Sequence, residues 1–156
     1  MPADILTGRV DALVVTALQD ELEAVLALGE GGRDGWREAR DQAGFPYYVR
    51  ALPNDRGQPL RVAAAWSGRM GESAAAARAQ GLIEELDPGC LAMCGICAGR
   101  RGEVSLGDVI VADRVYSHDE GKRVAPGGDG AAEFFHDIET YNLERTWNMD
   151  AALFAR

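Results

Sequence analysis

Positive charge is scarce in this sequence. Its 156 residues include 16 Lys and Arg against 25 Asp and Glu, which gives a formal net charge of −9 at pH 7. An excess of negative charge repels the phosphates of DNA, RNA and anionic membranes over most of the surface. We therefore expect neither a nucleic acid nor a membrane as a partner, whereas a small anionic ligand needs only a local positive pocket.

Long apolar runs are absent as well. The longest apolar stretch is Ala12–Leu18, with Thr16 inside it, and a membrane-spanning helix needs about 20 apolar residues. Met1–Val10 lacks the basic start and the apolar core of a secretory signal. The three cysteines are an odd number, which does not fit a framework of disulfides. These features predict a protein of the reducing cytoplasm.

The rest of the composition is that of a folded domain. Hydrophobic residues make up 47% and charged residues 26%, as in ordinary globular proteins. The length is enough for one domain with a core and too short for two, so we expect a single domain over residues 1–156. The sequence stops at Arg156 inside an expected helix, and a sheet covered on both faces needs more helices than the sequence predicts. We therefore expect this domain to be incomplete at its C-terminus.

Strand and helix patterns alternate along the chain. Residues 12–16 are a short apolar run that is typical of a buried parallel strand. The apolar residues that follow share one helical face: Leu18, Leu22, Val25 and Leu26. The other expected elements are a hairpin of strands 45–52 and 60–66, a helix at 72–86, strands at 90–94 and 108–113, and a helix at 143–156. This order predicts an α/β fold with a mixed central sheet and helices on both faces.

Polar or glycine-rich loops follow three of the expected strands, at Thr16–Glu21, Ser67–Gly71 and Gly95–Gly99. In α/β sheets, ligands bind outside the carboxyl ends of the strands. A single loop of this kind is explained equally well as a simple turn of the chain. Three such loops in succession indicate a binding site.

The same segments resemble the methylthioadenosine/S-adenosylhomocysteine nucleosidases of the nucleoside phosphorylase superfamily. Val14–Leu22 resembles their opening strand and acidic helix start, and Val62–Ala77 resembles their strand, Ser-Gly-x-Gly loop and alanine-rich helix. Cys94–Gly99 stands where the family has Thr-Gly-Ser-Ala-Gly-Gly. Val104–Asp113 is similar to its Lys-Val-Gly-Asp-Ile-Val-Val stretch, and His118-Asp119 to a His-Asp that follows it. The resemblance implies the N-terminal portion of a phosphorylase/hydrolase-like domain.

The resemblance also implies a reaction, the hydrolytic cleavage of the N-glycosidic bond of a purine nucleoside or nucleotide. The transition state of this reaction resembles an oxocarbenium ion, so such an N-glycosidase must place a water molecule and help the base to leave. The resemblance assigns the carboxylate on the water side to Glu21. The residues alone are also consistent with a solvated glutamate at a helix start. Members of the family form homodimers or larger homo-oligomers, which we expect here too.

Two of the loops are placed against the substrate by the resemblance. They contribute Ser67, Gly68, Arg69 and Met70, and Gly95, Ile96, Cys97, Ala98 and Gly99. Relatives that use phosphate have an arginine at the position of Met93, so its absence favours hydrolysis over phosphorolysis. Arg69 replaces an apolar residue of the methylthioadenosine nucleosidases. A guanidinium matches the geometry of a phosphate, which favours a nucleotide such as AMP or ATP. A loop arginine that points to solvent is an equal alternative.

Two functional pairs of the family are missing after Gly121. They are a Met-Glu that holds the ribose hydroxyls and a Ser-Asp whose carboxylate protonates the purine. Catalysis would be very poor without the acid, so we expect an effector domain of a longer protein in which the acid lies downstream. The alternative is a non-catalytic nucleotide-binding or regulatory module that keeps part of the fold.

Cys94-x-x-Cys97 has the spacing of a redox or zinc motif. A zinc site needs four ligands, and only Cys90 and two histidines remain. The family has small uncharged residues at these positions. We therefore interpret the cysteines as packing residues, and we expect no metal site and no cofactor.

Overall fold

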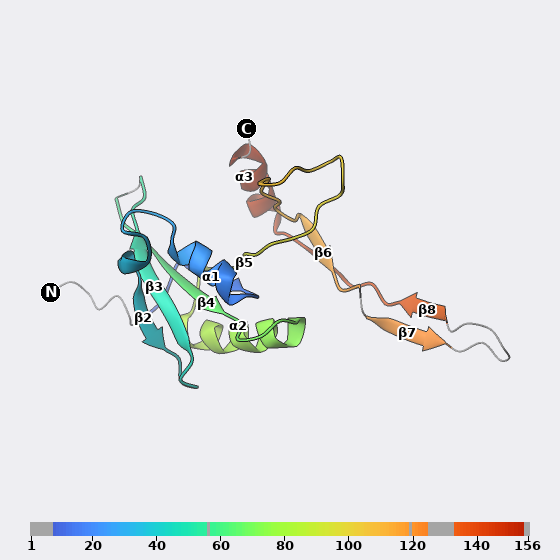
Figure 1. The fold of residues 1–156 in the computed structure, drawn as a ribbon, viewed down its shortest axis with the longest axis horizontal. Helices are drawn as coiled ribbons and strands as arrows, with labels where there is room; N and C mark the ends of the chain where they lie inside the picture. Colours follow the sequence, from blue (N-terminus) through green and yellow to red (C-terminus); the bar gives the residue numbers. More distant parts are fainter. Residues whose placement is uncertain (1–7, 56, 119, 125–132, 155–156) are drawn as a thin grey trace. The chain divides into compact units, whose positions relative to one another are not determined.

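The computed structural model describes residues 8–55, 57–118, 120–124 and 133–154. The chain forms two compact units, one that ends at Ala98 and one that begins at Gly99. Figure 1 shows the elements of both units, and each unit is described by itself. None of the described helices is long and apolar enough to cross a membrane.

The first unit is built on a five-stranded sheet with the strand order β2-β3-β4-β1-β5. The strands are β1 (Ala12–Thr16), β2 (Arg37–Arg40), β3 (Pro46–Leu52), β4 (Leu60–Trp66) and β5 (Cys90–Met93). The central strand β1 runs parallel to β4 and β5, while β3 runs antiparallel to β2 and β4. The mixed sheet that the sequence predicts is therefore confirmed.

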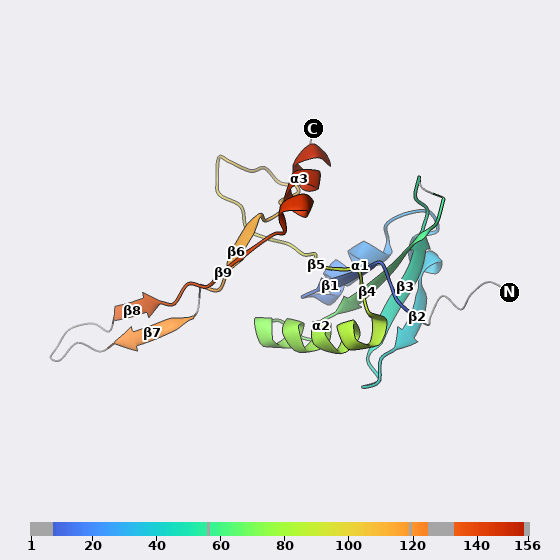
Figure 2. The same ribbon diagram turned by 180° about the vertical axis from the view of Figure 1, so that it is seen from behind.

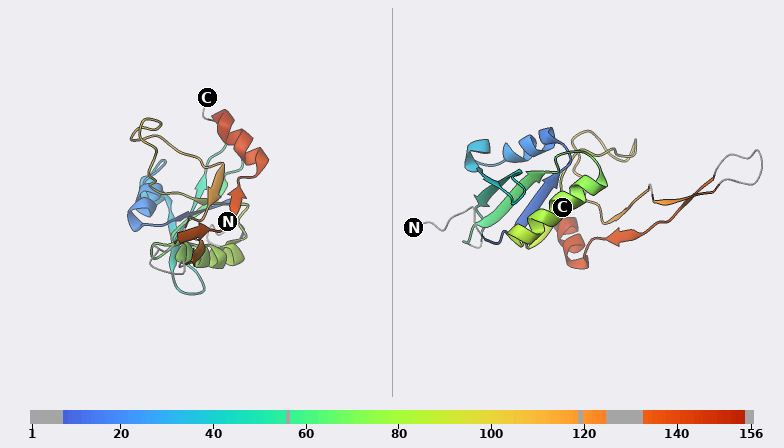
Figure 3. Two further views of the ribbon diagram at one scale, coloured as in Figure 1. Left: turned by 90° about the vertical axis from the view of Figure 1, so that its right-hand side faces the viewer. Right: turned by 90° about the horizontal axis from the view of Figure 1, so that it is seen from below.

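Two helices cover the two faces of this sheet, as the right-hand view of Figure 3 shows. They are α1 (Gln19–Leu26) and α2 (Glu72–Leu86), and a short 3₁₀ helix spans Gly32–Gly35. Successive side chains of a strand point to opposite faces. Leu13 and Val15 of β1 accordingly pack in one core cluster with Leu82 of α2, and Val14 packs in another with Leu22 of α1. The prediction of helices on both faces is confirmed.

The middle of β4 lets both helices approach the sheet closely. Ala63, Ala64 and Ala65 are completely buried and carry the smallest apolar side chains. Leu13 of β1 and Leu82 of α2 are also completely buried. Burial of a leucine side chain contributes roughly 1.5–3 kcal/mol to folding, so this cluster holds α2 firmly against the sheet and fixes the loop that precedes it.

The strand expected at 90–94 is present as β5, but its apolar side chains are not buried. Among the described residues of this sheet, β5 pairs only with β1. Its Leu91 and Met93 are 50% and 66% exposed. An edge strand has a neighbour on one side only, so an apolar sequence does not by itself bury it.

The second unit contains two small antiparallel pairs and a helix (Figure 2). The strand β6 (Arg114–Tyr116) pairs with β9 (Thr140–Asn142), β7 (Gly121–Val124) pairs with β8 (Glu133–His136), and α3 spans Arg145–Phe154. The helix expected over 143–156 is thus present. The strand expected over Asp108–Asp113 is wrong: this segment pairs with no described strand, and Val109 is 89% exposed. Its apolar residues favour a strand, but a strand forms only with a hydrogen-bonded neighbour.

Candidate functional site

Three of the predicted loops leave the sheet at one edge. The strands β4, β1 and β5 are neighbours and run parallel, so their carboxyl ends, Trp66, Thr16 and Met93, lie on the same side of the sheet. Residues 17–21, 67–71 and 94–98 follow these ends directly. The carboxyl edge of a parallel sheet is where α/β proteins bind their ligands.

The Glu21 carboxylate joins two of these loops. Its Oε2 accepts hydrogen bonds from the N–H groups of Ala17 at 3.1 Å and Leu18 at 2.9 Å, and its Oε1 accepts one from Ile96 at 2.8 Å. The first two bonds are local and close the start of α1, as a capping glutamate does. The third comes from 75 residues further along the chain. Glu21 is only 9% exposed. Through these hydrogen bonds the carboxylate joins the loop after β5 to the turn after β1.

Gly95 permits this contact because it has no side chain. A Cβ atom at this position would stand 2.8 Å from Oε1 and 3.0 Å from Cδ of Glu21. The first distance is shorter than real Cβ contacts and the second is unusually tight, so with any other residue either the loop or the Glu21 side chain would have to shift. The glycine that the sequence places in this loop therefore allows the close approach of Glu21.

The hydrogen bonds also fix the charge of Glu21. The N–H of Ile96, and then that of Leu18, hold the pKa of the carboxyl below its ordinary value of 4.5, while burial opposes them. The group is therefore ionised at neutral pH. A carboxylate has about four acceptor positions, and backbone N–H groups use three of them here. Among the described residues nothing occupies the remaining acceptor position, which can take a water molecule or a hydroxyl group.

The loop after β4 is tied to the same turn. Trp66 donates from Nε1 to the carbonyl oxygen of Ala17 at 2.9 Å. The Ser67 hydroxyl lies 3.4 Å from the same oxygen and donates to the carbonyl oxygen of Arg69 at 2.7 Å. Ser67, Gly68 and Arg69 also line a cavity of about 520 Å³ between α2 and residues 41–45.

The other predicted site residues have no described contact with Glu21. Met70 and the Ile96 side chain are 73% and 85% exposed, and Cys97 and Ala98 are exposed too. Gly99 begins the second unit. The structure thus brings Glu21, Gly95 and Ile96 into contact and connects Ser67 to them through Ala17.

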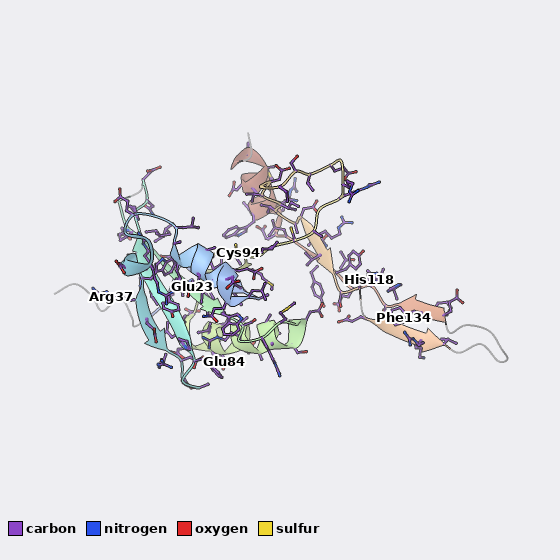
Figure 4. The ribbon with its side chains drawn as sticks, viewed as in Figure 1. Glu23, Arg37, Glu84, Cys94, His118 and Phe134 are labelled. Atoms are coloured by element: carbon purple, nitrogen blue, oxygen red, sulfur yellow. The ribbon has the colours of Figure 1, made fainter. Side chains whose placement is uncertain are left out.

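The packing interpretation of the Cys94-x-x-Cys97 motif is wrong. Both thiols are exposed, because the loop leaves the edge strand β5 where no described side chain covers it; Figure 4 labels Cys94 just after that strand. Cys90 is half-buried, and burial raises the pKa of its thiol.

The described part of the chain contains no candidate metal site. No group of three or more His, Cys, Asp and Glu residues there could hold a metal ion. The His118 ring, labelled in Figure 4, lies 4.6 Å from the His136 ring. Its neighbour Asp119 lies outside the described residues.

One charged pair near the site was missed by sequence reasoning. Arg78 of α2 forms an ion pair with Asp41, and the two side chains are only 8% and 9% exposed. The sequence signal that could have found it is Arg78 itself, a charged residue within the alanine-rich stretch of α2. Its partner lies 37 residues away, and no local pattern connects the two.

Comparison with known proteins finds one family. The sequence model of the Phosphorylase superfamily matches residues 11–155. The match includes Glu21, the loops at the sheet edge and most of both units. The superfamily contains nucleoside phosphorylases and nucleosidases. No curated protein and no solved structure matches the chain significantly.

Proposed function

Since the chain belongs to the phosphorylase superfamily, whose members process nucleosides, we propose that it hydrolyses the N-glycosidic bond of a purine nucleoside or nucleotide. The observation that supports this proposal most is the Glu21 carboxylate. It is buried, ionised and held at the carboxyl edge of the sheet with one acceptor position left over.

Glu21 suits the water side of such a reaction. In hydrolysis, the bond from the ribose carbon to the purine nitrogen breaks, water adds to the carbon, and the base leaves with a proton. A fixed carboxylate can hold the attacking water and stabilise the positive charge that develops on the ribose. Because its pKa is lowered, Glu21 is a poor proton donor. The proton for the leaving base must therefore come from another group.

Hydrolysis fits this edge of the sheet better than phosphorolysis. A phosphate nucleophile carries negative charge and needs cationic partners. The residue that ends β5 is Met93, where phosphate-using relatives have an arginine, and the Glu21 carboxylate accepts a hydrogen bond from the loop that follows this strand. That carboxylate would repel phosphate and attract the partly positive hydrogens of water.

Arg69 supports a nucleotide as the substrate. Its side chain is exposed, and among the described residues nothing pairs with its guanidinium. Its backbone is held by Ser67, which connects it to the turn that carries Glu21. A 5′-phosphate of AMP or ATP would give this guanidinium a partner.

The test is release of free base. The full chain is incubated with methylthioadenosine, adenosine, inosine, AMP and ATP, with and without phosphate, and the products are separated by chromatography. We expect base and free ribose product without phosphate. Glu21→Gln should reduce the turnover number, while Glu23→Gln, an exposed glutamate on the same helix paired with Arg33, should not. Base release only with phosphate would identify a phosphorylase instead.

A non-catalytic nucleotide-binding module is the second candidate. The observation that favours it is that all three described partners of Glu21 are structural N–H groups, as in a purely capping role. Calorimetric binding of AMP without any release of adenine would support this candidate over the nucleosidase.

A further inference from the structure

A cavity of about 520 Å³ lies between α2 and residues 41–45, beside the loop that follows β4. Ala74, Ala77 and Gly81 line it from the helix. These positions are three and four residues apart and therefore share one helical face. Their small side chains leave this face open, and a Cβ atom at Gly81 would meet nothing within 4 Å.

A buried ion pair holds the opposite wall in place. Arg78 pairs with Asp41 and also donates from Nη2 to the carbonyl oxygen of Pro46 at 2.7 Å and from Nε to that of Trp66 at 3.3 Å. Its guanidinium lies over the Phe45 ring, 5.6 Å from the ring centre. The Phe45 ring is thus fixed as an aromatic wall, and the charges of Arg78 and Asp41 compensate one another.

One positive charge of the cavity is left uncompensated. Arg69 lines the cavity with an exposed side chain, and no described residue pairs with its guanidinium. The Ser67 hydroxyl holds the Arg69 carbonyl at 2.7 Å and so fixes where this side chain begins. A local positive charge beside an apolar cavity is notable in a chain with a net charge of −9, because it selects an anion.

We propose that this cavity binds a small aromatic anion, with the ring against Phe45, Ala74 and Ala77 and the anionic group on Arg69. Cavities of about 300–1,000 Å³ with apolar walls and a few polar groups are typical of small-molecule sites. The site shares Arg69 with the nucleotide that we propose as the substrate, but its walls are formed by other residues, and none of its lining residues has a described contact with Glu21.

The test compares an anionic and a neutral ligand of the same shape. The full chain is titrated with 2-naphthoate and with 2-naphthol by calorimetry at neutral pH. We expect naphthoate to bind at least about tenfold more tightly, since an ion pair with Arg69 is available to it alone. In Arg69→Gln this preference should disappear, while Arg37→Gln on the exposed strand β2 should keep it.

A second pair of variants tests the cavity itself. Ala77→Leu fills it from an exposed position of α2, and naphthoate binding should weaken by about tenfold or more. Ala76→Leu changes the neighbouring residue, which does not line the cavity, and binding should not change. Circular dichroism and urea unfolding check that both variants are folded.

Three results would overturn the proposal: equal binding of naphthoate and naphthol, unchanged binding in folded Ala77→Leu, or no binding to the wild-type chain. AMP, itself an aromatic anion, is then added to the naphthoate complex. Displacement assigns the cavity to the nucleotide, and simultaneous binding assigns it to a second ligand of the same chemistry. Failure of base release alone would leave this proposal untouched, since no step of it requires turnover.

Discussion

The Glu21 carboxylate meets three backbone N–H groups, two from its own turn and one from the loop after β5. A side chain in this position stabilises the fold whether or not it also takes part in catalysis. The two roles can be separated because the first depends on hydrogen bonds to the backbone, and the second depends on the one acceptor position that is left.

Glu21→Gln should destabilise the first unit. A glutamine amide offers one oxygen, so at least one backbone N–H would face its NH₂ group. The loss of one hydrogen bond to a charged group costs roughly 1.5–3 kcal/mol, which urea unfolding can measure. Glu23→Gln is the matched control, because its ion pair with Arg33 is exposed and its loss should cost under about 1 kcal/mol. Equal stability of the two variants would contradict a structural role for Glu21.

Acid should remove the advantage of Glu21 over glutamine. The pKa is lowered in the folded chain from an ordinary value of 4.5, so the stabilising charge is fully present above 4.5 and is lost as the pH falls through the lowered folded value. The difference in unfolding free energy between wild type and Glu21→Gln should therefore be largest at neutral pH and shrink below 4.5. A difference that grows on acidification would show that the carboxylate is not ionised in the folded state.

Gly95→Ala should separate the loop from the carboxylate. The new Cβ would lie 2.8 Å from Oε1 of Glu21, so the loop or the carboxylate must move and the hydrogen bond from the Ile96 N–H should weaken. Hydrogen exchange of the Ile96 amide should become faster, and any base release should fall by about tenfold or more. Gly81→Ala, where a Cβ meets nothing within 4 Å, should leave the exchange of the Ile96 amide unchanged. Unaltered exchange at Ile96 in Gly95→Ala would refute the close contact.

At the scale of elements, the apolar pattern located most of the first unit. The strand at 60–66 and the helix at 72–86 have the predicted bounds, because turn residues and glycines mark their ends. β2 was missed, since Arg-Glu-Ala-Arg has no alternation of apolar residues and becomes a strand only by pairing with β3. The segment 108–113 has the composition of a strand without a described neighbour to pair with.

The site was predictable to the extent that it depends on side chains. Glu21 and the glycine loop were found through their resemblance to a family. The donor from Ile96 is a backbone N–H, which every residue except proline carries, so no sequence pattern identifies it. The pair of Arg78 and Asp41 arises only when α2 packs on the sheet, which brings two distant segments together.

Arg78→Met tests how strongly α2 is joined to the connection between β2 and β3. Removal of one partner leaves the Asp41 carboxylate buried and unpaired, which costs about 3–5 kcal/mol. Arg100→Met is the control, because the Arg100–Glu103 pair is exposed and should contribute about 0–1 kcal/mol. Urea unfolding measures both. A similar small loss in the two variants would mean that the buried pair does not hold these elements together.

At the scale of the whole chain, the family match extends over both units. The contacts within the chain nevertheless form two compact units. A single domain over residues 1–156 stays a proposal, and a single cooperative unfolding transition would support it. The second unit exposes several large apolar side chains, among them Leu106, Val109 and Val111. Exposed apolar surface of this kind marks interaction sites.

We predict that the chain forms homo-oligomers through such residues. In sedimentation experiments it should exceed the 16.7 kDa of one chain, increasingly so at higher concentration. Leu106→Glu combined with Val109→Glu should shift the distribution toward the monomer, since burying a charge at an interface is costly. Glu103→Gln, a change at an exposed polar position nearby, should not. A monomer at every concentration would rule out the predicted assembly.

The position of β1 in the sheet has a consequence for biosynthesis. β1 leaves the ribosome before its two neighbours in the sheet, which are β4, ending at Trp66, and β5, ending at Met93. At about 5–20 residues per second, the central strand waits roughly 4–15 s for its second partner. During that interval the apolar run of β1 is exposed to other nascent chains and to chaperones. Rare codons between residues 66 and 93 would lengthen it, and the yield of folded protein should fall accordingly.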